Sequence, residues 1–505
     1  MECRYFSCLK NAVTPFVLLL FVVVQVGVFG QNAVAQNAST GFPRIESDPK
    51  ALAFFQLGQG RDYSWAELAE IGLWASGADN SRLEQINALA EAIRQSPDFP
   101  SSERGRAEFV LSFMHSHALK GYVFNQTRVD TMFENGRFNC VSSAVLYTIL
   151  CKSVGIDVHG VMTKDHAFAT VRIGGEDIDV ETTNPIGFDP GSRTEFHDQF
   201  GKVTGFAYVP AQNYRDRQTI NPIELISLIL SNRIAELEKA NRFADAVPLG
   251  VDRATLLSGT AKTAYQATSA LFEDPAEYQL DRFINYGAFL LQGGKEEDAL
   301  RWALLASERY PDGSRWQELI HAAANNRVSR LVKAGRTAEA RNFLDAQKAI
   351  LPSAIYAEID SMLLDAELFA LADSITDVAQ GDKTVAAIDD ARSSGRIDGN
   401  RAKELLTFAV QKTASVLSAS PGRDWLAAIN YIEKAVARFG ANSELDRALE
   451  GYRGNRATDF HNRFANAWNK GNTEEAMQIL DAGLAEFPSN RRLLQDKEMV
   501  QKNRS

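Results

Sequence analysis

The feature that most constrains the fold of this 505-residue chain is a repeated pattern in its second half. From about Ile220 onward the alternation typical of strands is absent, and a G-x-x-x-x-A pattern recurs. Its three clear copies, each with a proline twelve residues after the alanine, are Gly294–Ala299 (Pro311), Gly335–Ala340 (Pro352) and Gly471–Ala476 (Pro488). Glycine allows a tight turn, alanine lets a helix pack closely, and proline ends that helix. Residues 220–495 are therefore predicted to be helical.

This pattern resembles the tetratricopeptide repeat, although the copies stand farther apart than the usual spacing of about 34 residues. The resemblance implies an all-α repeat domain that binds a protein or peptide partner. The alternative is a helical bundle without repeats. Residues 496–505 are interpreted as a polar tail.

The N-terminus has the pattern of an export signal. Arg4 and Lys10 precede an apolar run, Phe16–Phe29, and Ala33–Ala35 then supplies a small-x-small cleavage site. Residues 1–35 are predicted to be a signal peptide, with an uncleaved membrane anchor as the alternative, and residues 36–48 a linker. In either case the bulk of the chain is expected outside the cytoplasm, in the periplasm or cell envelope.

Charge excludes one class of partner. The formal net charge is -10, and the basic residues are scattered along the chain. Nucleic-acid binding requires a clustered basic face, so no nucleic-acid partner is expected.

Two cysteines remain after the signal, at the two ends of the apolar stretch NCVSSAVLYTILC. On one helix Cys140 and Cys151 would stand roughly 16 Å apart, too far for a disulfide. The positive end of the helix dipole at Cys140 favours a thiolate, which is the nucleophilic form of cysteine. We therefore interpret Cys140 as the reactive thiol and Cys151 as a structural one.

Strand-like segments after this helix supply candidates for a base and an acid. His166 begins the segment HAFATVRI, and a Gly174–Gly175 turn leads to DIDVETT. Asp179 and Glu181 share one face of that second strand, where a carboxylate can lie beside His166. A nucleophilic cysteine needs an imidazole to take its proton and a third group to orient the ring.

The segments FNCVSSAVLYTILCKSVGI and HAFATVRIGGEDIDVETTNP resemble the transglutaminase-like superfamily of papain-related cysteine enzymes. The resemblance implies an α+β domain over residues 49–219, followed by the all-α repeats. It also implies that Cys140 is the nucleophile, His166 the general base and Glu181 the orienting acid, with Asp179 as the alternative acid. It implies no cofactor and no metal ion.

Two functions follow as hypotheses. The first is an exported enzyme that forms a thioester at Cys140 and passes the acyl group to water or to an amine, with the helical repeats binding a protein or peptide substrate. The second is a non-catalytic adaptor in the cell envelope, in which the cysteine-containing domain is only a scaffold.

Overall fold

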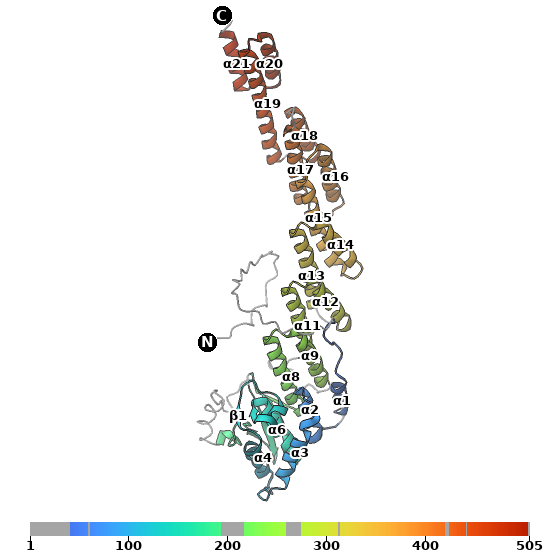
Figure 1. Ribbon diagram of the computed structural model, residues 1–505, viewed down its shortest axis with the longest axis vertical. Coiled ribbons are helices and arrows are strands. Elements are labelled where there is room, and N and C mark those ends of the chain that lie inside the picture. The colour runs from blue at the N-terminus through green and yellow to red at the C-terminus, as the bar shows by residue number, and fades with distance from the viewer. Residues whose placement is uncertain are drawn as a thin grey trace. The chain divides into compact units, whose positions relative to one another are not determined.

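The computed structural model describes residues 41–58, 61–164, 166–192, 217–258, 274–311, 314–419, 424–440 and 442–502 (Figure 1). The predicted signal peptide and the strand-like segment expected at residues 206–210 lie outside these ranges. Among the described helices, none combines the length and the apolar character needed to cross a membrane.

The expected α+β class is wrong. The described part of the chain is 72% helical and only 6% strand, with 19 α-helices and two small sheets, so the protein is mostly α. The sequence contains genuine strand patterns, but they produce strands of only two to seven residues. Helices form most of the described first half as well, including a short one at Val129–Asn135.

Five α-helices of the described chain precede the cysteine-containing helix. Ser64 caps the second of them through a capping box, because its side chain accepts from the backbone N–H of Glu67 while the Glu67 carboxylate accepts from the backbone N–H of Ser64. The five are α1 (Pro49–Leu57), α2 (Trp65–Ala75), α3 (Leu83–Arg94), α4 (Glu103–His117) and α5 (Val129–Asn135).

The larger sheet is antiparallel and has the strand order β5-β4-β3-β6. Its strands are β3 (Asp157–Met162), β4 (Ala167–Ile173), β5 (Glu176–Val180) and β6 (Gln218–Ile220). The smaller sheet pairs β1 (Gly121–Tyr122) in parallel with β2 (Arg137–Phe138), just before the cysteine-containing helix.

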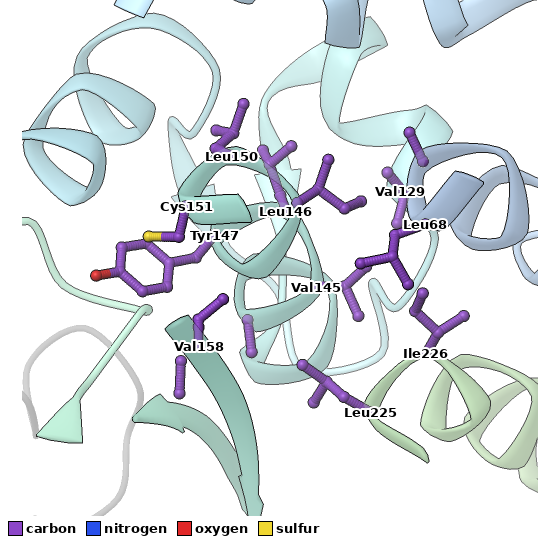
Figure 2. Close-up of a cluster of buried hydrophobic side chains, with 14 of the residues drawn as sticks. Leu68, Val129, Val145, Leu146, Tyr147, Leu150, Cys151, Val158, Leu225 and Ile226 are labelled. Atoms are coloured by element: carbon purple, nitrogen blue, oxygen red, sulfur yellow. The ribbon is translucent and has the colours of Figure 1, made fainter. Parts of the chain in front are cut away.

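That helix, α6 (Cys140–Ser153), lies at the centre of the main hydrophobic core. It contacts α2, α4, α8 (Pro222–Lys239) and strands β3 and β4. Figure 2 shows Leu68 of α2 and Ile226 of α8 among the side chains packed around it. Because α8 contributes to this core, the boundary predicted between residues 219 and 220 divides one continuous core rather than two domains.

Helices continue from α8 to the end of the described chain, and each contacts the next. Gly294, Gly335 and Gly471 stand between helices with φ of +70°, +72° and +80°, a region that glycine adopts readily. The alanines of the three copies are fully buried, as close helix packing requires. The helices after α8 are α9 (Phe243–Leu257), α11 (Pro275–Gln292), α12 (Glu296–Arg309), α13 (Ser314–Lys333), α14 (Thr337–Gln347), α15 (Ser353–Asp373), α16 (Val378–Ser393), α17 (Gly399–Ala419), α18 (Trp425–Phe439), α19 (Ser443–Asn469), α20 (Thr473–Glu486) and α21 (Arg491–Lys502).

The predicted linker and the predicted polar tail both contain packed residues. In the predicted linker 36–48, Arg44 forms a bidentate ion pair with the buried Asp252 of α9, and Ile45 is buried. Residues 496–502 of the predicted polar tail are helical. These residues belong to α21, whose Val500 packs in a small core with Phe464.

Candidate functional site

Cys140 is the first residue of α6. Asn139 caps the helix, since its Oδ1 accepts from the backbone N–H of Ser142 at 3.0 Å and Ser142 Oγ accepts from the backbone N–H of Asn139 at 3.0 Å. The Asn139 side chain also donates to Phe124 O. This capping fixes the helix start, so Cys140 lies at the positive end of the dipole.

The two cysteines have different environments. Cys140 is partly exposed, whereas Cys151 is fully buried among apolar side chains near Tyr147 (Figure 2). Burial raises the pKa of Cys151 to about 12, although a hydrogen bond from Tyr147 acts in the opposite direction. Cys151 is therefore a packed thiol rather than a nucleophile.

His166 and Glu181 form a buried pair. The imidazole Nε2 donates to Glu181 Oε2 at 2.7 Å, and the two side chains are 14% and 3% exposed. The other ring nitrogen remains for Cys140, which lies within hydrogen-bonding reach of the imidazole. Phe168 stacks on the ring with centroids 6.0 Å apart, which restricts its rotation. The structure thus brings Cys140, His166 and Glu181 together.

Local hydrogen bonds hold Glu181 in place directly after β5. Its Oε1 accepts from both the backbone N–H and the hydroxyl of Thr183, at 3.1 and 2.7 Å. The neighbouring Thr182 shares a hydrogen bond of 2.9 Å with Ser143 Oγ, one turn into the helix that begins at Cys140. The end of β5 and the start of α6 are therefore tied together, so that the carboxylate and the thiol keep a fixed separation.

Asp179, the alternative acid, has a different partner. It lies opposite Thr170 in the sheet and forms a bidentate ion pair with Arg217, with N–O distances of 2.6 and 2.5 Å. His166 donates its hydrogen bond to Glu181 instead.

Electrostatics at the site favour a charged imidazole. Burial by itself lowers the pKa of His166, but the negative charge of Glu181 and the hydrogen bonds with Cys140 and Glu181 outweigh burial. The pKa of His166 is consequently raised well above its ordinary value. An imidazolium beside a thiol stabilises the thiolate.

Tyr122 is a site residue that sequence reasoning missed. It pairs with Phe138 in the parallel β1–β2 ladder, and Phe138 lies two residues before Cys140. The Tyr122 phenol lies within hydrogen-bonding reach of the Cys140 thiol. Burial, followed by the charges of Cys140 and Glu181, raises the pKa of Tyr122, so the phenol remains a donor at neutral pH. Its strand has only two residues, which is too short to show a periodic pattern in the sequence.

A pocket of about 690 Å³ opens beside the thiol. Cys140 and His166 line it together with residues of β3, β6, α8 and α9. Its volume lies within the usual range for ligand-binding pockets, about 300–1,000 Å³. The participation of α8 was also missed, because the sequence placed that helix in a separate domain.

The remaining histidines near the sheet have structural partners. His115 lies next to the carbonyl of Thr182, with Nε2 at 3.0 Å, and burial lowers the pKa of His115 to about 4. His117 stacks on Phe113. Within the described ranges, no group of three or more His, Cys, Asp or Glu side chains is arranged to hold a metal ion.

No protein-family model matches this chain, and no curated protein matches it either. The geometry of the site therefore has to support the functional argument by itself.

Proposed function

We propose that the protein is an exported cysteine-dependent acyl-transfer enzyme, which cleaves or exchanges an amide through a thioester at Cys140. The observation that supports this most directly is the hydrogen-bonded chain from a thiol at a helix start, through His166, to the buried Glu181. A packed cysteine needs neither an oriented imidazole nor a carboxylate behind it.

In the proposed reaction the Cys140 thiolate attacks the carbonyl carbon of an amide, and a C–S bond forms. The oxyanion of the tetrahedral intermediate accepts hydrogen bonds from the backbone N–H of Cys140 and from the Tyr122 phenol. The intermediate collapses, the C–N bond breaks, and the leaving amine takes a proton from the His166 imidazolium. Water or a second amine, deprotonated by His166, then attacks the thioester and releases the thiolate.

A generic acyl donor tests this proposal without knowledge of the natural substrate. Incubation with p-nitrophenyl acetate should add one acetyl group to Cys140, detected by mass spectrometry of a quenched sample. Hydroxylamine should remove that group, as expected for a thioester. Cys140→Ser is the variant that should abolish thioester formation, and Cys151→Ser is its matched control.

The competing hypothesis is the non-catalytic adaptor. It predicts that folded protein acquires no hydroxylamine-labile acetyl group at Cys140 above the level of a free thiol such as glutathione. That outcome would refute the enzyme proposal.

A further inference from the structure

The pocket beside Cys140 is extended along one face of α8. The α8 residues that line it fall between Glu224 and Glu236, at the spacing of three and four residues that keeps side chains on a single face of a helix. At about 1.5 Å per residue, this face is roughly 18 Å long. An extended peptide advances about 3.3–3.6 Å per residue, so about five residues match that length.

One row of side chains on this face is small, beside a second row formed by Leu228, Asn232 and Glu236. Ser227, Ser231 and Ala235 follow one another at four-residue intervals, and all three line the pocket. Small side chains let the backbone of a bound chain approach the helix closely. A bulky residue at any of the three positions would fill that space.

A buried amide supplies a second, independent observation. Gln218 of β6 lines the same pocket and is 2% exposed, yet its Oε1 has no hydrogen-bond partner among the described residues. Buried acceptors are almost always paired, because an unpaired one loses its hydration without compensation. An N–H group of a bound peptide would provide the missing donor.

Helix α8 is held in place relative to the Cys140 thiol. Asn232 Nδ2 donates to Thr127 Oγ1 at 3.1 Å, and Arg233 Nη1 donates to Ala75 O at 2.5 Å. Leu225 and Ile229 of the same helix are fully buried in the core around α6. The pocket is therefore largely preformed, which lowers the entropic cost of ordering a ligand in it.

We propose that the substrate is an extended peptide of about five residues that lies along α8, close to Ser227, Ser231 and Ala235, and donates an N–H to Gln218. This inference rests on the proposed function, since it assigns the substrate class of the same thiol. Residues of α8 thus determine which peptides bind, whereas the reacting groups come from α6 and the larger sheet.

A length series of peptide probes tests the inference. N-acetylated alanine peptides of one to six residues, each ending in a chloromethyl ketone, alkylate cysteine with loss of chloride. The rate constant for Cys140 alkylation should rise at least about 10-fold from one residue to five and then level off. Gln218→Leu should reduce the rate with the five-residue probe by about 5-fold.

Ala235→Trp should remove most of the length dependence, because Ala235 is an exposed position that lines the pocket. Lys239→Trp is the matched control, since Lys239 is exposed on the same helix outside the pocket. In the Lys239→Trp variant the rate with iodoacetamide, which is too small to use the α8 face, should equal that of the unmodified protein.

A rate that does not depend on probe length, or equal length dependence in the Ala235→Trp and Lys239→Trp variants, would overturn the α8 inference. If Cys140 still forms an acetyl thioester in that case, the proposed function stands alone. If Cys140 forms no thioester while length dependence persists, the groove is a peptide-binding site and the enzyme proposal fails.

Discussion

Alkylation by iodoacetamide should distinguish the two cysteines sharply. Cys151 is fully buried, and at pH 6 a pKa of about 12 leaves only about one side chain in a million as thiolate. Cys140 is partly exposed and lies beside the charged imidazole of His166. We expect folded protein at pH 6 to be modified at Cys140 and to remain unmodified at Cys151.

His166→Ala is the perturbation that tests the origin of this reactivity. The variant removes the imidazolium that stabilises a thiolate beside it, and a cysteine with the ordinary pKa of about 8.5 is only about 0.3% thiolate at pH 6. The alkylation rate of Cys140 should therefore fall by about 100-fold at pH 6. At pH 9 the loss should be much smaller, since an ordinary cysteine is then largely ionised.

The assay is a time course of alkylation followed by peptide mapping, with urea-unfolded protein as the reference for full accessibility. Circular dichroism must be unchanged in the His166→Ala variant. Equal and slow modification of both cysteines in the unmodified protein would refute the reasoning. So would an unchanged Cys140 rate at pH 6 in a folded His166→Ala variant.

Three further outcomes follow from the same geometry. Glu181→Gln should slow Cys140 alkylation at pH 6 by about 10-fold, because the imidazolium loses a charge-assisted hydrogen bond to the carboxylate. Asp179→Asn, which removes a carboxylate that pairs with Arg217, should change the rate less than about 2-fold. A larger loss in Asp179→Asn than in Glu181→Gln would make Asp179 the orienting acid. Tyr122→Phe should slow acetyl transfer from p-nitrophenyl acetate by about 100-fold if the phenol binds the oxyanion, and a normal rate in stopped-flow measurements would exclude that role. His115 has a folded pKa of about 4, lowered by burial, against about 6.5 in the unfolded chain, so only the unfolded chain takes up this proton between those values. The contribution of His115 to the free energy of unfolding should be fully present above about pH 6.5 and should fall by about 3 kcal/mol toward pH 4. In His115→Gln, the free energies of unfolding in urea at pH 7 and near pH 4 should therefore differ less than in the unmodified protein.

Local patterns predicted the individual elements around the site well. The apolar stretch after Asn139 forms α6, and the segments beginning at His166 and Asp177 contain the residues of β4 and most of β5. These elements depend on periodicity and capping, which short-range contacts decide. The α+β class that the resemblance implied for residues 49–219 is wrong, because short strand patterns do not show how far helices dominate the fold.

Long-range packing was beyond the reach of sequence patterns. The sequence offered two acids on one strand face, and only the pairing of Asp179 with Arg217 and of Glu181 with His166 separates their roles. Likewise, a two-residue strand brings Tyr122 to the thiol without any periodic signal.

The amino-acid sequence by itself determined a thiol at the start of a buried helix, a histidine at the head of a strand and an acid on the next strand. Only the tertiary structure decided which acid meets the imidazole and that α8 lines the pocket. The physical reason is that helix starts and strand faces follow from neighbouring residues, whereas the partner of a buried charge follows from distant segments that share one core.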